Sequence, residues 1–214
     1  MADYRDRIKV SDTAATKYNS RKPGKHLAEI RLVERALRDL DGISTVLDAP
    51  CGTGRFSILM AQEGYVTTGV DLGDAALAQA ENNCKSAGVT DVTLEKGDLE
   101  QLPYAVSSFD MVFCFRMFHH FPDAVVRERV VGELCRVARK YVLISYFDPR
   151  AITSIKRRLQ RRFFGKKSKQ NATSLQEVEG YFRKHDFELT GNLARVPILH
   201  TIRLATFECA EQIG

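Results

Sequence analysis

Three acidic residues and two glycines, each placed where a strand is expected to end, are the residues of this chain best suited to hold a small polar ligand. Asp48 ends a short apolar run and is followed by Gly52 and Gly54, which let the backbone turn sharply and let a ligand approach the main chain. Asp71 and Asp98 end the next two strand-like runs. The third glycine of a nicotinamide-binding fingerprint is absent. A carboxylate at the first turn suits a ligand with a positive group better than a pyrophosphate.

A histidine pair follows the fourth strand-like run, which ends in Phe115-Arg116. Because histidine titrates near neutral pH, His119 and His120 are candidate bases for a substrate that must lose a proton. The alternative is that the pair shapes a pocket without exchanging protons. Arg116 is a candidate for holding a carboxylate, and the alternative is a surface arginine at a strand end.

Strand-like and helical runs alternate along the chain and must bring these residues together. The predicted strands are 45–48, 65–71, 92–96, 109–115, 141–146, 187–194 and 200–209. The predicted helices are 12–18, 26–40, 54–63, 73–87, 124–139 and 174–185. Alternation of this kind is typical of a parallel sheet covered on both faces, whose strands end along one edge. We therefore expect the acidic residues to meet at that edge.

The predicted fold class is α/β, a Rossmann-like, doubly wound, mostly parallel seven-stranded sheet with an antiparallel C-terminal edge hairpin. The helix before this hairpin opens with the capping box Ser174-Leu-Gln-Glu177. Residues 1–25 are predicted to form an N-terminal arm or cap, and residues 26–214 a single domain. A basic lid-like insertion is predicted at 149–173.

The positive charge of the chain is concentrated in that insertion. The 214 residues include 32 Lys+Arg and 27 Asp+Glu, for a formal net charge of +5. Nine basic residues and no acidic one lie between Arg150 and Lys169, leaving 23 basic against 27 acidic residues elsewhere. From Ile152 the segment has the pattern of a basic amphipathic helix, which could lie on an anionic membrane surface, cover an anionic substrate as a lid, or simply be solvated. Nucleic acid is a further alternative, but no nucleic-acid-binding module accompanies it.

Cysteine usage and hydropathy favour a cytoplasmic protein. The five cysteines are odd in number and form no C-x-x-C pair, as expected of reduced thiols in apolar runs. No run of 18 apolar residues could span a membrane, and the first residues lack the apolar core of a signal peptide. Contact with the inner face of the membrane through 150–169 stays open.

The run Asp48-Ala-Pro-Cys-Gly-Thr-Gly54 resembles the first motif of class I S-adenosylmethionine-dependent methyltransferases of the small-molecule type. Matching motifs follow in order at Asp71-Leu72, at Asp98-Leu99 and at the run that ends in Phe115-Arg116. The resemblance implies S-adenosylmethionine as cofactor, with S-adenosylhomocysteine as product. In the family, the acid after the second strand binds the ribose hydroxyls and the acid after the third binds the adenine amino group. The cofactor-binding residues implied here are Tyr18, Arg21, Asp48, Ala49, Gly52, Gly54, Asp71, Leu72, Asp98, Leu99, Phe115 and Arg116.

The resemblance implies transfer of a methyl group to oxygen or nitrogen of a small-molecule or lipid-linked acceptor, and the basic segment suggests that this acceptor is anionic. His119 and His120 are the catalytic candidates, and no metal ligand set is expected. Tyr18 and Arg21 lie in a segment that resembles the arm closing over the cofactor. The alternatives are an RNA or protein methyltransferase and a non-catalytic cofactor-binding module. The intact set of acidic and glycine motifs argues against the last.

Overall fold

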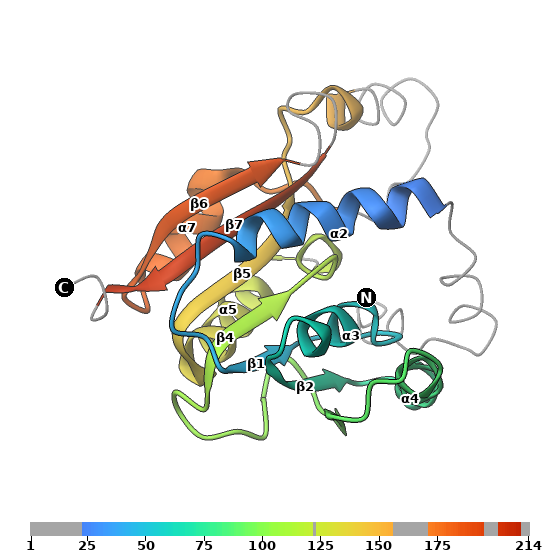
Figure 1. Cartoon of the computed structure of the whole chain (residues 1–214). Coiled ribbons are helices and arrows are strands. Elements are labelled where there is room, and N and C mark those ends of the chain that lie inside the picture. Colours follow the sequence, from blue (N-terminus) through green and yellow to red (C-terminus); the bar gives the residue numbers. More distant parts are fainter. Residues whose placement is uncertain (1–22, 122, 156–170, 195–200, 211–214) are drawn as a thin grey trace.

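The computed structural model describes residues 23–121, 123–155, 171–194 and 201–210, in which one seven-stranded sheet has the order β3-β2-β1-β4-β5-β7-β6 (Figure 1). The strands are β1 (Thr45–Asp48), β2 (Val66–Asp71), β3 (Val92–Lys96), β4 (Phe109–Cys114), β5 (Ala138–Phe147), β6 (Phe187–Ala194) and β7 (Ile202–Cys209). The helices are α2 (Pro23–Leu37), α3 (Arg55–Gln62), α4 (Asp74–Ser86), α5 (Ala124–Val137) and α7 (Leu175–Arg183), with a short 3-10 helix η2 (Phe118–His120).

The five strands β1 to β5 are parallel, and β7 lies antiparallel between β5 and β6. The predicted fold class is therefore confirmed, including the antiparallel hairpin at one edge. Because the parallel strands all run the same way, β1, β2, β3 and β4 end at a common edge, where the acidic residues were expected. Within the described ranges, every helix is too short or too polar to cross a bilayer.

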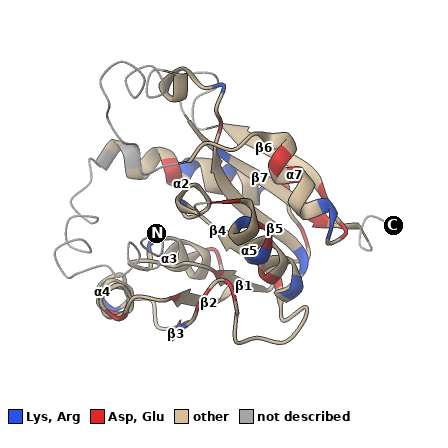
Figure 2. Ribbon diagram, turned by 180° about the vertical axis from the view of Figure 1, so that it is seen from behind, with Lys and Arg blue, Asp and Glu red and all other residues tan. Residues whose placement is uncertain are grey.

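Helices cover both faces of the sheet. On one face, Leu32 and Val33 of α2 and Phe56 of α3 pack on Val46 and Phe113 of the central strands. On the other face, α5 and α7 pack over β4, β5 and β7 in a larger apolar cluster. Figure 2, seen from behind, shows α5 and α7 in front of the sheet, carrying both acidic and basic residues. The core therefore lies in two layers, one on each face of the sheet.

The prediction was wrong where α5 meets β5. The helix was expected to continue to Arg139, but the strand begins at Ala138 and continues to Phe147. Ala138 pairs with Phe109 across the parallel ladder, and sheet pairing of this kind overrides local helix preference. The longer strand extends to Phe147, three residues beyond Ile144, which pairs with the last residue of β4, and the Phe147 ring stacks on the candidate His119.

The predicted cap of α7 is present in one direction only. Ser174 Oγ accepts a hydrogen bond from the Glu177 amide at 3.2 Å. The Glu177 carboxylate turns instead to Arg127 Nη1, at 2.7 Å, and to the Tyr181 hydroxyl, at 2.8 Å. A charged donor is a stronger partner than a backbone N–H, so the reciprocal bond of the capping box is replaced by a link between α7 and α5.

Candidate functional site

The turn after β1 is built around a buried carboxyl group. Asp48 is only 1% exposed and accepts a hydrogen bond from Ser57 Oγ at 2.7 Å. Burial raises the pKa of Asp48 to about 7, because a carboxylate in an apolar environment loses its hydration. Ala49, the next residue, is fully buried. The candidate ligand group at this turn therefore titrates near neutral pH.

Two glycines give this turn its shape. Gly52 and Gly54 have φ angles of +56° and +79°, which non-glycine residues rarely adopt. A Cβ on Gly54 would lie 3.0 Å from the Cβ of Ala80 on α4, whereas one on Gly52 would meet no atom within 4 Å. Glycine is therefore required at position 54 both by the positive φ and by the close contact with Ala80. At position 52 it is required by the positive φ alone, because the space beside the backbone is open.

Asp71 joins this turn to the next one. Its Oδ2 accepts the Gly52 amide at 2.9 Å and its Oδ1 accepts the Gly73 amide at 2.8 Å. Burial raises its pKa, and these backbone N–H groups act in the opposite direction. Each carboxylate oxygen has a second lone pair, so both can still accept a ligand hydroxyl. Leu72 lies half-buried beside it. The residues present fit the ribose end of the implied cofactor.

The third acidic residue lies where β3 has ended. Asp98 is half-buried, and its Oδ1 accepts the Glu100 amide at 3.0 Å. Leu99 is buried in the apolar cluster beneath α5. β2 and β3 are neighbouring parallel strands, so Asp98 and Asp71 belong to the same edge. The sequence prediction that these motifs converge is borne out by the strand order.

The end of β4 carries a charged network that sequence reasoning missed. Arg116 Nη1 donates to Glu29 Oε1 at 2.8 Å, and Arg55 Nη2 donates to Glu29 Oε2 at 2.8 Å. Arg116 has a φ of 60°, and its amide donates to Ser145 Oγ at 2.6 Å. Its neighbour Phe115 is buried against Phe56. A left-handed backbone at arginine costs about 1–3 kcal/mol and is typical of functional sites.

Among the described residues, this network holds one more positive than negative charge. Glu29 is 3% exposed; burial alone would raise its pKa, but Arg116 and Arg55 lower it below the ordinary value. Two guanidinium groups therefore share one carboxylate. Arg55 Nε and Nη1 are buried and have no hydrogen-bond partner among the described residues. The surplus charge lies between the glycine turn and the end of β4, where it suits the carboxylate of an amino acid.

The two histidines differ in their surroundings. His119 is 1% exposed and stacks on Phe147, with ring centroids 3.8 Å apart and planes at 7°. His120 is half-buried, and its ring lies 4.2 Å from that of His119. Both belong to η2, next to β4 and β5. His119 is therefore enclosed against Phe147, and His120 is the more accessible of the pair.

Some of the predicted elements lie outside the described residues. These are Tyr18 and Arg21 of the arm and most of the basic insertion, 156–170. The described part of the insertion is helical at Ile152–Ile155, as expected. Within the parts of the chain that the structure describes, no three histidine, cysteine or acidic residues gather in a group that could hold a metal ion.

Comparisons with known proteins agree with this geometry. The profile of a family described as methyltransferase domain matches residues 46–141. A chloroplastic magnesium protoporphyrin IX methyltransferase of Arabidopsis thaliana is 33% identical over 109 residues, which cover 51% of this chain and 34% of that protein. A ubiquinone biosynthesis O-methyltransferase of Nitrosospira multiformis is 38% identical over 92 residues, which cover 42% of this chain and 38% of that protein. The matches thus span only about a third of these relatives.

The fold has well-matched solved neighbours. A magnesium protoporphyrin IX methyltransferase from Synechocystis PCC 6803, crystallised with S-adenosylhomocysteine, superposes with a TM-score of 0.77 at 16% identity, covering 95% of this chain and 97% of that one. At this identity the likeness concerns the fold. The methyltransferase-domain profile matches residues 46–141, which include the four motifs that follow one another at the ends of four parallel strands, so this part of the chain is similar to S-adenosylmethionine-dependent methyltransferases.

Proposed function

We propose that this protein transfers a methyl group from S-adenosylmethionine to an oxygen or nitrogen atom of a small-molecule acceptor. The observation that carries the proposal is the convergence of Asp48, Asp71 and the Gly52 turn at one sheet edge, where Asp71 accepts the Gly52 and Gly73 amides and Asp48 accepts the Ser57 hydroxyl. When bound, the cofactor supplies a methyl group on a positively charged sulfur, which the acceptor lone pair displaces. Relatives named for magnesium protoporphyrin IX and ubiquinone biosynthesis support a small organic acceptor.

In the proposed reaction, the residues of this protein mainly bind and orient the cofactor and the acceptor. Asp71 would hold the ribose hydroxyls and Asp98 the adenine amino group. Arg116 and Arg55, with their one surplus positive charge, would hold the carboxylate of the methionine part. Gly52 would let that part lie against the main chain. Holding an acceptor in line with the methyl carbon can supply most of the rate enhancement of such a displacement.

If the acceptor atom loses a proton on methylation, a general base must take up that proton. His120 is our candidate base, because it is half-buried at the end of β4 whereas His119 is enclosed against Phe147. The expected result is that His120→Ala lowers kcat more than about tenfold without changing S-adenosylhomocysteine affinity. His119→Ala is the comparison: it should lower stability by creating a cavity.

The acceptor is proposed to be anionic or lipid-linked, on the strength of the basic residues between Arg150 and Lys169. The test is incubation with methyl-labelled S-adenosylmethionine and a cell extract separated into aqueous, lipid, RNA and protein fractions. Label in the lipid or aqueous small-molecule fraction is expected. Label in RNA or protein would support the alternative acceptors. Binding of S-adenosylhomocysteine with no label transferred would favour a non-catalytic module, and no binding by calorimetry would overturn the cofactor itself.

A further inference from the structure

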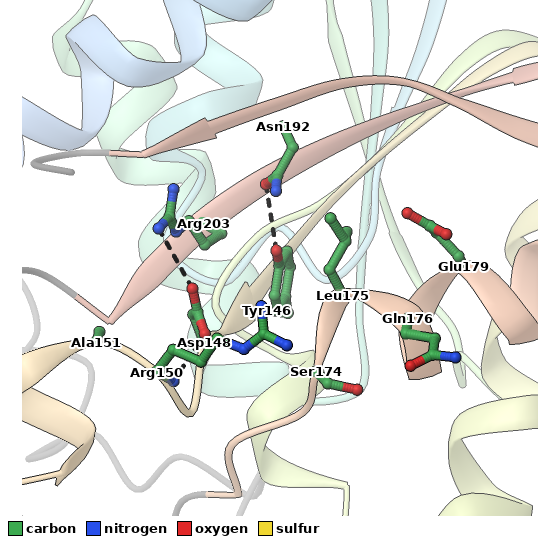
Figure 3. A pocket seen from close by; sticks show the side chains of 10 residues that line it. All are labelled: Tyr146, Asp148, Arg150, Ala151, Ser174, Leu175, Gln176, Glu179, Asn192 and Arg203. Carbon is green, nitrogen blue, oxygen red and sulfur yellow. Dashed lines mark hydrogen bonds and ion pairs between the residues drawn. The ribbon is translucent and has the colours of Figure 1, made fainter. Parts of the chain in front are cut away.

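A pocket of about 470 Å³ opens at the carboxyl end of β5, away from the residues assigned to the cofactor. Figure 3 shows its walls: Tyr146 on β5, the turn at Asp148–Ala151, the first turn of α7, and Asn192 and Arg203 on the edge hairpin. None of the cofactor-binding candidates or histidines lines it. Polar and apolar surface contribute about equally to its lining, so the pocket can hold a ligand that carries a polar group.

The charges of the pocket do not cancel once internal pairs are removed. Arg203 Nη2 lies 3.3 Å from Asp148 Oδ2, and Glu179 lies 3.7 Å from Arg183 on the same helix. These two carboxylates therefore have cations of their own. Arg150 has no ion-pair partner among the described residues, and its guanidinium reaches toward Tyr146 and Ser174 in Figure 3. One positive charge is left facing the pocket.

A buried donor in the same wall also lacks an acceptor. Arg203 Nε is fully buried and makes no hydrogen bond within the described part of the chain, although Nη2 of the same side chain is paired. A buried donor left without an acceptor is costly. Because Nε is closed to solvent, a ligand oxygen reaches it only when the Arg203 side chain rotates toward the pocket. The first amides of α7 border the pocket as well, and helix N-termini favour anions. The donors thus come from three separate elements.

We propose that this pocket binds a phosphate group, with Arg150 and Arg203 as its principal ligands. A phosphate offers several oxygens at once, so it can meet donors on the β5 turn, β7 and α7 together, which a single carboxylate cannot do. The pocket is larger than inorganic phosphate alone, so the group would belong to a phosphate ester. The proposal stands on the pocket itself and does not depend on the proposed methyl transfer.

Two sources of such an ester fit the surroundings. Ile152 and Ile155, just beyond Arg150, are 49% and 38% exposed, and the sequence continues into basic residues from Lys156. Exposed aliphatic side chains followed by cations suit a phospholipid headgroup at a membrane surface. A free phosphorylated small molecule presents the same chemistry. The experiment therefore has one arm for the group and one for its source.

The first arm follows backbone amide and arginine Nε–H signals by NMR while inorganic phosphate replaces chloride at constant ionic strength. We expect saturable shifts in the millimolar range, confined to Arg203 Nε–H, the Arg150 turn and the start of α7. Arg150→Gln should weaken this binding about tenfold or more, since it removes a charged donor. Lys184→Gln, an exposed cation at the far end of α7, should change it by less than about twofold. No saturable shift, or equal affinity in both variants, would overturn the proposal.

The second arm measures co-sedimentation with phosphatidylcholine vesicles that contain phosphatidic acid, a lipid with a phosphate monoester. Wild-type binding that Arg150→Gln reduces and Lys184→Gln does not would identify the ester as a lipid headgroup. Equal vesicle binding by all three proteins, with the phosphate response lost only in Arg150→Gln, would identify a free phosphate ester. Arg150 is exposed, so its replacement leaves the core intact, and thermal unfolding of each variant checks this.

Discussion

The two halves of the sheet use their carboxylates in opposite ways. In the cofactor half, made of β3, β2, β1 and β4, Asp48 and Asp71 are almost fully buried and accept hydrogen bonds from a serine and from glycine turns. In the outer half, made of β5, β7, β6 and α7, Asp148 and Glu177 are neutralised by arginines. Among the described residues, Asp48 and Asp71 have no ion-pair partner and are held by neutral donors, whereas Asp148 and Glu177 are each paired with an arginine.

The largest expected effect follows from Asp48. Its pKa in the folded protein is about 7, against about 3.9 in an unfolded chain, so between these values the folded state keeps a proton that the unfolded state releases. Stability attributable to this group therefore falls as the pH rises from about 4 to 7, by about 4 kcal/mol in all. Asp48→Asn cannot ionise, and it should be more stable than wild type by this order of magnitude above pH 7.

The measurement is the difference in free energy of unfolding between wild type and Asp48→Asn, obtained by urea titration at several pH values. Other carboxyl groups titrate in both proteins and cancel in the difference. Below about pH 3 the two proteins should be equally stable, because Asp48 is then protonated in both the folded and the unfolded state. If the difference in free energy of unfolding did not change with pH, ionisation of Asp48 would not destabilise the folded protein. The two halves would then not differ in how they hold their carboxylates.

Asp71→Ala should produce the next largest effect, on binding. The substitution leaves the Gly52 and Gly73 amides without their acceptor and removes the proposed ribose ligand, so S-adenosylhomocysteine affinity should fall about 100-fold. Isothermal calorimetry checks this. The matched control is Asp110→Asn: Asp110 is also a buried carboxylate and binds the Ser44 and Thr45 amides, but at the opposite end of β4. The control should lower stability and leave affinity unchanged.

The cofactor half was the part that the sequence could predict. β1 and β3 begin and end where expected, and the acidic residues lie at or just after the strand ends, because these signals are local: an apolar run, a glycine turn and a carboxylate within a few residues. Parallel order then follows from helix-strand alternation. The family profile covers this half too, and it ends at Tyr141, just inside β5.

The rest depended on contacts between residues far apart in the chain. Glu29 meets Arg55 across 26 positions and Arg116 across 87, and nothing in the apolar periodicity of α2 marks it as a ligand of both. The Glu177 carboxylate was expected at its own helix cap, but Arg127 of α5 binds it from 50 positions away. The pocket beyond β5 likewise needs three separate elements. Local patterns predict strand ends well and side-chain partners poorly.

Substitution of Arg116 tests whether this residue, which contacts both halves of the sheet, acts on the ligand or only on the fold. Arg116 lies two residues after β4 of the cofactor half, while its amide donates to Ser145 Oγ of β5. Arg116→Gln removes the surplus positive charge of the Glu29 network, so affinity for S-adenosylhomocysteine should fall about tenfold. Affinity for 5′-methylthioadenosine, which lacks the amino acid part, should stay within about twofold. Equal losses for the two ligands would show that Arg116 acts only by supporting the fold.

The smallest expected effect is confined to the outer half. Ser174 Oγ caps α7 through the Glu177 amide, and Asp123 caps α5 in the same way through the Val126 amide at 3.0 Å. Replacing either cap with alanine should cost about 1 kcal/mol of stability, measured by urea unfolding. Because α7 contributes no candidate cofactor ligand, Ser174→Ala should leave S-adenosylhomocysteine affinity unchanged. A cap that altered this affinity would couple α7 to the cofactor turns, and the two halves would then act as one unit instead of separately.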